Sequence, residues 1–359
     1  MTDTPGTRAV LLMNLGSPSS TAVRDVKTYL HEFLMDERVI DYPYLFRKLL
    51  VDGIIVPFRA PRSAEAYRRI WWDEGSPLIV ITKRLVAELS GRVDVPVQWC
   101  MRYGSPRPDE AMDALLHANP HLREVLLIPL YPHYAMSSYE TAVVYAQHWH
   151  RKKHYPFQLS ILRPFYDDAG YIEVLSTHIQ QFLKPDHHLL FSYHGVPERH
   201  IRKSDITSQH CLQRADCCDV ASPAHAYCYR HQVIRTTRLV AERLQLKTEQ
   251  YELSFQSRLG KEPWLRPYTA QRLEELPAEG RKKLQVVCPA FVSDCLETLE
   301  EIEQEGKKIF MEHGGESFQM IPCLNTIPAW IALLQEWIHQ FVMGDRTMIW
   351  NELQNTKAG

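Results

Sequence analysis

The segment LLFSYHGVP (189–197) places a single histidine, His194, at the end of an apolar run. The run is typical of a buried strand, and Gly195 and Pro197 are typical of the turn that ends it. An imidazole can accept a proton or bind a divalent cation at neutral pH. Because a lone histidine is more often structural, His194 needs partners before it indicates a site.

Carboxylates are the first possible partners. On a helix beginning at Asp294, a row of acidic side chains in SDCLETLEEIEQE (293–305) would share one face. Such a row could bind a divalent cation and pass protons. The alternative is that Asp294 and Glu297 form a capping box at the start of an ordinary helix. The row consists of Asp294, Glu297, Glu301 and Glu305, at spacings of three, four and four residues.

A second group of reactive side chains lies in CLQRADCCDVASPAHAYC (211–228), which holds four of the eight cysteines at the spacing C-x5-C-C-x9-C. Four thiolates satisfy the ligand requirement of a 2Fe–2S cluster. The alternatives are a labile disulfide, free thiols, or zinc bound with His210, His225 or His231. Adjacent cysteines fit a zinc C-x2-C knuckle poorly, and a cytoplasmic setting disfavours a disulfide. We therefore expect a cluster, structural or sensing in role, on Cys211, Cys217, Cys218 and Cys228.

The composition narrows the class of protein. The 359 residues are 45% hydrophobic and 23% charged, as in a soluble globular protein, and the net charge of −2 gives no basic field for nucleic acid. The start MTDTPGTRAV lacks a signal pattern, and no apolar run is long enough to span a bilayer. We expect a cytoplasmic protein. The glycine patterns of nucleotide-binding loops and of a serine-hydrolase elbow are also absent, so we expect no nucleotide cofactor.

The elements that position these residues follow from short apolar runs that alternate with amphipathic segments. The runs are typical of parallel strands covered on both faces, which predicts a doubly wound α/β fold. Polar residues such as His133, His194 and Ser257 follow the runs. In such sheets, ligands bind beyond the carboxyl ends of the strands, so we expect these residues to converge. The expected strands are 9–16, 124–131, 188–194, 251–257 and 284–291.

The sequence resembles the ferrochelatases, enzymes that insert ferrous iron into a porphyrin. Seven segments carry the resemblance, in order, over roughly residues 9–330, so it covers nearly the whole chain. They are LLMNLGSP, AYRRIWWDEGSPL, MRYGSP, LYPHYAMSS, FSYHGVP, FQSRLGKEPWLRPYT and CPAFVSDCLETLEEI.

The resemblance implies two similar Rossmann-like lobes, each a parallel sheet flanked by helices, with the active-site cleft between them. We expect an N-terminal lobe over 1–180, with the porphyrin-entrance lip at about 41–59. We expect a C-terminal lobe over 181–345, with a cysteine-rich insertion at about 205–230, and a tail over 346–359. The implied reaction inserts Fe²⁺ into protoporphyrin IX, the final step of haem biosynthesis.

The resemblance also implies roles for individual residues. His194 and Glu297 match a catalytic pair that faces each other across the macrocycle, and both are expected to contact the Fe²⁺ substrate. Asp294 and Glu301 match an acidic ladder behind Glu297. The residues expected to contact the porphyrin are Tyr67, Arg102, Tyr103, Trp264 and, on the entrance lip, Arg59.

These residue types suit the chemistry. A free porphyrin has two inner N–H protons that must leave as the metal enters. Distorting the flat ring costs binding energy but exposes its nitrogens. A histidine and carboxylates on opposite faces can share proton removal and cation delivery, and the sequence leaves open which face does which.

Some ferrochelatases carry a 2Fe–2S cluster ligated partly by cysteines near the C-terminus. No cysteine follows Cys323 here, and Met136 stands where a cluster-bearing relative can have cysteine. That placement is excluded here, but the four cysteines of 211–228 still satisfy the requirement of a 2Fe–2S cluster for four thiolates.

Two other functions compete with this interpretation. One is a related chelatase, such as one inserting cobalt into a sirohydrochlorin-type ring; such enzymes usually rely on paired histidines. The other is a non-catalytic tetrapyrrole carrier. The long EPWLRPYT and CLETLEEI matches argue against the first, and the presence of both His194 and Glu297 argues against the second.

The segment DYPYLFRKLLVDGIIVPFR (41–59) is richly apolar. It could be core, line a pocket for a flat ligand, or rest on a membrane surface. Because porphyrins partition into lipid, we expect reversible, peripheral association with the inner face of the cytoplasmic membrane. A homodimer is left open, and no nucleic-acid partner is expected.

Overall fold

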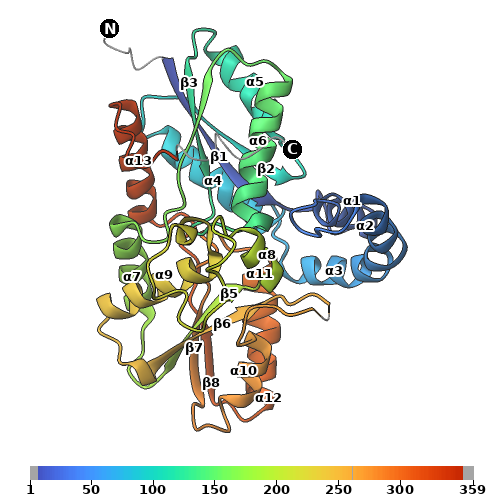
Figure 1. Ribbon diagram of the computed structural model, residues 1–359, viewed down its shortest axis with the longest axis vertical. Coiled ribbons are helices and arrows are strands. Elements are labelled where there is room, and N and C mark those ends of the chain that lie inside the picture. Colours follow the sequence, from blue (N-terminus) through green and yellow to red (C-terminus); the bar gives the residue numbers. More distant parts are fainter. Residues whose placement is uncertain (1–6, 261, 351–359) are drawn as a thin grey trace. The chain divides into compact units, whose positions relative to one another are not determined.

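The computed structural model describes residues 7–260 and 262–350 and divides into two compact units. Unit 1 comprises residues 1–130, 137–164 and 326–359, and unit 2 comprises 131–136 and 165–325. Each is built on a four-stranded parallel sheet, in the order β2-β1-β3-β4 in unit 1 and β6-β5-β7-β8 in unit 2 (Figure 1). The predicted α/β fold, with two similar lobes of parallel strands and helices, is confirmed.

In unit 1, helices α4 and α13 pack together, as do α5 and α6, and α4, α5 and α6 contact the sheet (Figure 1). The strands are β1 (Arg8–Gly16), β2 (Val97–Tyr103), β3 (Glu124–Pro129) and β4 (Gln158–Ile161). The helices named so far are α4 (Pro77–Ser90), α5 (Pro108–Ala118), α6 (Thr141–Lys152) and α13 (Pro328–Val342). A further group of helices comprises α1 (Val23–Leu34), α2 (Tyr44–Leu50), the π-helical turn η2 (Val51–Ile55) and α3 (Val56–Ile70).

The central strand β1 shows why a continuous apolar run folds this way. All but one of its residues are buried, because helices cover the sheet on both faces. The strand ends at Gly16, whose φ of +112° suits glycine, and a Cβ there would lie 1.8 Å from the carbonyl oxygen of Tyr103. Glycine is therefore required where β1 meets the end of β2.

In unit 2, α7 and α9 pack together, and so do α10 and α12 (Figure 1). The strands are β5 (His188–His194), β6 (Tyr251–Gln256), β7 (Lys283–Val287) and β8 (Ser317–Met320). These helices are α7 (Ala169–Phe182), α9 (Tyr229–Arg243), α10 (Thr269–Glu275) and α12 (Lys307–Glu312). Further elements are α8 (Glu198–Lys203), η4 (Pro223–Tyr227), η5 (Thr248–Gln250), α11 (Leu296–Leu299) and the π-helical turn η6 (Glu301–Gly306). A third π-helical turn, η3 (Met136–Glu140), belongs to unit 1 except for Met136.

The expected boundaries between the two lobes at residue 180, and between the second lobe and the tail at residue 345, are wrong. The reason is that the chain, after completing unit 2, returns to the sheet of unit 1. Helix α7 belongs to unit 2, whereas α13 and the segment after it belong to unit 1. The return is held by Arg346, whose Nη1 lies 2.6 Å from Oε1 of Glu124, and by Trp350, whose N–H donates to the carbonyl of Ile161 over 2.8 Å. The rest of the expected tail, 351–359, lies outside the described residues.

In the part of the chain that the structure describes, no helix combines the length and the apolar character needed to cross a membrane.

Candidate functional site

His194 is the last residue of β5, and its imidazole orientation is fixed locally. Its Nδ1 lies 2.7 Å from the carbonyl oxygen of Gly195, and the hydroxyl of Tyr229 donates to its backbone carbonyl over 2.9 Å. Because a carbonyl only accepts, Nδ1 must carry the hydrogen, and the lone pair of the neutral ring is on Nε2. The nitrogen whose lone pair could accept a proton or bind a metal ion is therefore Nε2.

The turn after His194 has no room for a side chain. A Cβ on Gly195 would lie 2.8 Å from the carbonyl oxygen of Gln256 and 3.1 Å from the indole of Trp264. Trp264 itself is only 8% exposed and forms a β-bridge with Pro197. The structure thus places Trp264 directly against the turn that follows His194.

The acidic segment does not form the single helix that the spacing predicts. Helix α11 begins after Cys295, whose N–H donates to the Thr298 hydroxyl over 3.1 Å, so the alternative interpretation, a capping box of Asp294 and Glu297, is wrong. The π-helical turn η6 then interrupts the α-helical period. As a result Glu305 is exposed, and the expected row of four carboxylates is wrong at that end.

Asp294 is buried and its carboxylate is already occupied. Its oxygens accept hydrogen bonds from the Thr298 hydroxyl (2.9 Å), the Asn325 amide (2.6 Å) and the Cys323 N–H (3.3 Å). These contacts hold the start of α11 against the chain that follows β8. Its expected place in an acidic ladder stays a prediction.

Glu297 and Glu301 form a coupled pair. Burial raises the pKa of Glu301 to about 7, and the negative charge of Glu297 contributes in the same direction. Ser257 opposes this shift, because its N–H donates to Oε1 of Glu301 over 2.7 Å and its hydroxyl donates to Oε2. A carboxyl with a pKa near neutrality, beside a second carboxyl, can accept and release protons.

In unit 1, Arg102 and Tyr103 converge on a residue that the sequence analysis missed, Asp36. The Arg102 guanidinium pairs with Asp36, the Tyr103 hydroxyl donates to it over 2.8 Å, and the Thr141 hydroxyl also donates to it. Burial favours the neutral acid, but Arg102 and the hydrogen bonds outweigh burial and lower the Asp36 pKa. Tyr103 has no exposed surface, so the structure uses its hydroxyl to hold Asp36.

The other residues expected to contact the porphyrin in this unit lie on α3. Tyr67 is 5% exposed and packs edge-to-face against Tyr29 and Trp71 at ring-centroid distances of 6.3 and 6.0 Å. Arg59 is exposed. Direct contact of Arg59, Tyr67, Arg102, Tyr103 and Trp264 with a substrate stays a prediction.

The segment 41–59 carries apolar side chains on the surface. Their exposed fractions range from 55% for Phe46 to 75% for Phe58, so these side chains are not core. Such a cluster is typical of an interaction surface. We call it the lip, consisting of Tyr44, Leu45, Phe46, Leu49, Ile54 and Phe58.

The four loop cysteines are buried, and their thiols form a chain of contacts. The thiol of Cys228 hydrogen-bonds to those of Cys211 and Cys218, and Cys218 also contacts Cys217. The contact with Cys211 and burial raise the Cys228 pKa to about 12, although Cys218 opposes the shift. Arg230 donates to the sulfurs of Cys217 (3.3 Å) and Cys218 (3.5 Å).

Polar residues around the loop fix its backbone. Asp205 accepts from the N–H groups of His210 (2.8 Å) and Cys211 (2.7 Å). His225 and His231 stack with ring centroids 3.6 Å apart, and the three histidines all contact carbonyls of Cys217 or Cys218. Within residues 7–260 and 262–350, however, no group of three or more His, Cys, Asp or Glu side chains is arranged to hold a metal ion. In the described residues the four thiols therefore lie in contact with one another, but they are not arranged around a single metal ion.

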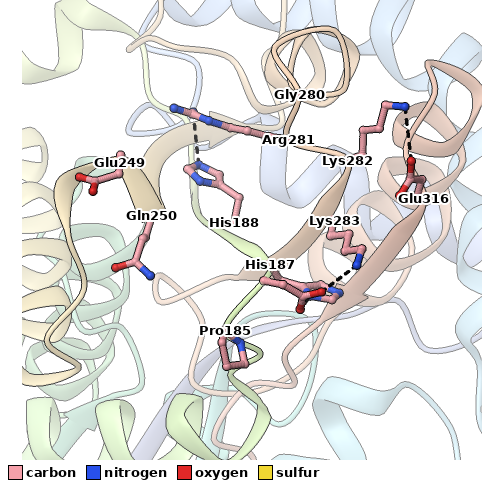
Figure 2. Close-up of a pocket in the computed structure, with 11 residues that line it drawn as sticks. Pro185, His187, His188, Glu249, Gln250, Gly280, Arg281, Lys282, Lys283 and Glu316 are labelled. Carbon is pink, nitrogen blue, oxygen red and sulfur yellow. Dashed lines mark hydrogen bonds and ion pairs between the residues drawn. The ribbon is translucent and has the colours of Figure 1, made fainter.

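A cavity of about 420 Å³ lies at the opposite, amino-terminal ends of β5 and β7 (Figure 2). Two ion pairs lie within it, Lys283 with Asp186 (2.7 Å) and Lys282 with Glu316 (3.3 Å). It contains none of the residues expected to do chemistry, because His194 lies at the other end of β5. We do not assign the reaction to it.

Comparison with known proteins gives one family. The ferrochelatase family profile matches residues 7–342. The chain is 50% identical to the ferrochelatase of Opitutus terrae, over 91% of this chain and 95% of that protein. It is 49% identical to that of Ectopseudomonas mendocina, over 91% and 96% of the two chains. Among solved structures, the chain is similar to SirB from Bacillus subtilis with Fe³⁺, with a TM-score of 0.55 and 8% sequence identity. The superposition covers 96% of this chain and 100% of the SirB chain. At this identity the similarity concerns the fold alone.

Proposed function

The chain belongs to the ferrochelatase family, and from this premise we propose that His194 and Glu297 carry out its reaction. The enzyme inserts Fe²⁺ into protoporphyrin IX, releases two protons and makes protohaem, the final step of haem biosynthesis. The proposal concerns which residues of this chain remove the protons and handle the metal.

His194 removes a proton from the porphyrin through Nε2, the nitrogen that carries the lone pair while Nδ1 faces the Gly195 carbonyl. Glu297 acts from the opposite face of the ring, where a carboxylate can guide the incoming cation. Glu301 takes up a proton passed on from Glu297, because its pKa of about 7 lets it exchange protons at neutral pH. Asp294 supports the start of this acidic path.

The observation that carries the proposal is that His194 and Ser257, the residue that binds Glu301, lie at the carboxyl ends of two neighbouring strands. His194 ends β5, and Gln256, its partner in the β5–β6 register, is followed by Ser257, which binds Glu301. A base and a coupled pair of carboxyls therefore lie beyond the carboxyl end of one sheet, where parallel sheets bind their ligands.

The test is metal insertion by the purified protein under anaerobic conditions. With protoporphyrin IX and Fe²⁺ or Zn²⁺, the four visible bands of the free porphyrin should be replaced by the two bands of the metallated ring. Bound but unmetallated porphyrin would favour a carrier. Turnover of a sirohydrochlorin-type ring with Co²⁺, but not of protoporphyrin, would favour the related chelatase.

For the substrate itself, we propose that Tyr67 and Trp264 contact the porphyrin and that Arg59 lies at its entrance. Arg102 and Tyr103 act on the metal side, where Arg102 is anchored to Asp36. The exposure of Arg59 supports its place at the entrance. The convergence of charged and hydroxyl groups on Asp36 supports the role proposed for Arg102 and Tyr103 on the metal side.

We also propose that the loop cysteines hold a 2Fe–2S cluster, with Cys211, Cys217, Cys218 and Cys228 as ligands. The contacts among the four thiols support it, and so do the donors that surround the sulfurs, Arg230 and the N–H of His231 at 3.5 Å from Cys228. Such a cluster supplies redox sensitivity or loop rigidity. Metal insertion needs no electron transfer, so no step of the reaction is assigned to it.

Finally, we propose that the protein is cytoplasmic and associates reversibly with the inner face of the cytoplasmic membrane through the lip. Two observations support this: the six exposed apolar side chains, and the exposed Arg59 and Arg62 that follow them on α3. An apolar surface beside cations suits a bilayer with anionic headgroups.

A further inference from the structure

Gln256 forms hydrogen bonds with the segment that carries His194 and with the segment that carries Glu297. It is the last residue of β6, lies opposite His194 in the register and is 3% exposed. Its backbone carbonyl accepts from the N–H of Gly195 over 2.8 Å, which ties it to the residue after His194. Its side-chain Nε2 donates to the backbone carbonyl of Glu297 over 2.9 Å.

The amide of Gln256 has only one satisfactory orientation. Its Oε1 accepts from the Ser192 hydroxyl over 2.7 Å and lies 3.7 Å from the Cys288 sulfur. The carbonyl of Glu297 can only accept, so a flipped amide would set two oxygens against each other and lose this bond. Nε2 also bonds the carboxyl of Glu301, on the π-helical turn. The side chain is thus a rigid connection between the sheet and the acidic segment.

We propose that Gln256 is the positioning residue that holds Glu297 in place relative to His194. The inference rests on the proposed roles of His194 and Glu297. Gln256 is buried and does not touch the substrate. It acts through the segments to which it is hydrogen-bonded, those of His194 and Glu297. Helix α11 has only four residues, so its own hydrogen bonds cannot fix the position of Glu297.

A connection of this kind matters because reacting groups must be held closely. A displacement of about 1 Å can reduce a rate by about 10²-fold while substrate binding is largely kept. Loss of the Gln256 bond should therefore lower kcat more than it changes KM for the porphyrin.

The experiment compares Gln256→Met with Gln285→Met. Gln285 is a matched control: it is fully buried in the same sheet, and its amide also connects backbone groups, the carbonyl of Phe182 (2.7 Å) and the N–H of Lys184 (2.9 Å). Those contacts lie at the other end of the sheet from His194. We expect both variants to lower Tm to a similar extent. Only Gln256→Met should lower kcat, by about 10- to 100-fold, with KM for protoporphyrin within about threefold of the wild-type value.

Gln256→Asn keeps a buried amide but is one methylene too short to bond Ser192 and Glu297 together, so it should show the same loss of kcat with a smaller change in Tm. Equal kcat in Gln256→Asn, Gln256→Met and Gln285→Met would overturn the inference. That result is distinguishable from failure of the proposed function, because His194→Ala and Glu297→Gln are assayed alongside. Activity in those two variants would overturn the catalytic roles and this inference together.

Discussion

Ser257 binds both carboxylate oxygens of Glu301, one through its backbone N–H at 2.7 Å and the other through its hydroxyl. To do so it adopts a φ of +65°, a left-handed conformation that few residues other than glycine adopt. Unusual backbone conformations of this kind cluster at functional sites. Ser257 stabilises the charged form of Glu301 against burial and against the charge of Glu297, and the resulting pKa is about 7.

The first prediction concerns the pH dependence of Glu301→Gln. If deprotonated Glu301 accepts protons from the reaction, kcat/KM of the wild-type enzyme should rise with pH through about 7. Glu301→Gln should lose this rise and at least about tenfold in rate. The control is Glu305→Gln, since Glu305 is exposed four residues further along, and its pH profile should match the wild type.

The raised pKa of Glu301 also makes the stability of the folded protein depend on pH. Between the ordinary pKa of 4.5 and about 7, the folded protein keeps a proton on Glu301 that the unfolded chain has lost. The free energy of unfolding should therefore fall as pH rises through that range and level off above it. Glu301→Gln should remove this contribution, which thermal unfolding at several pH values will detect. An unchanged pH profile in Glu301→Gln would mean that another group titrates.

The second prediction is that His194→Ala folds but loses metal insertion by several orders of magnitude, because the basic Nε2 is removed. Tyr229→Phe is an informative companion: it removes only the hydrogen bond to the His194 carbonyl and should cost a few-fold. Circular dichroism and single-turnover absorption measurements check fold and rate. More than about a tenth of the wild-type rate in His194→Ala would reject its role.

The third prediction tests the proposed catalytic role of Glu297. Glu297→Gln changes charge with little change in shape, so turnover should fall at least about 10²-fold while porphyrin binding, followed by fluorescence quenching, stays intact. Thr298→Val is the contrasting variant, because it removes the hydroxyl that caps α11. It should lower Tm more than Glu297→Gln does. A loss of stability without loss of turnover in Glu297→Gln would assign Glu297 to the helix instead.

Most strands that the sequence predicts are almost fully buried, whereas the first three residues of β6 are only half-buried. All five expected runs are strands, because a parallel sheet covered by helices needs continuous apolar residues. The other three strands, β2, β4 and β8, lack a continuous apolar run and were not predicted. β2 contains Gln98 and Arg102, and β4 and β8 have four residues each, too short and too polar to stand out.

The site was predictable where chemistry follows a local pattern and not where it depends on pairing across the chain. His194 at a strand end and the acidic segment are visible locally. The π-helical turn that exposes Glu305 is not, because the acidic spacing there is that of an ordinary α-helix. Asp36 and Gln256 act through partners 66 and 41 residues away, and only folding identifies those partners.

The fourth prediction concerns the lip. Replacing Leu45, Leu49 and Phe58 by glutamate should abolish flotation with vesicles that contain phosphatidylglycerol, because each substitution places a charge on the apolar surface. Met343→Glu is the matched control, since Met343 is 72% exposed but lies outside the lip, and it should float like the wild type. Tm of the triple variant should stay close to that of the wild type, as these side chains are exposed. Wild-type protein that fails to float at low salt would contradict the proposal.

The fifth prediction concerns the cysteine loop. Protein purified without oxygen should be red-brown and contain iron and acid-labile sulfide in equal amounts, because four thiolates hold a 2Fe–2S cluster. Replacing Cys211, Cys217, Cys218 or Cys228 by serine should bleach the protein and expose the loop to proteases. The control is Cys100→Ser: Cys100 is equally buried, but it lies in β2, and its loss should leave the colour unchanged. Metal insertion should survive in the bleached variants, because the reaction transfers no electrons. Colourless wild-type protein with stoichiometric zinc would instead assign the loop to a zinc site formed by cysteines together with His210, His225 or His231.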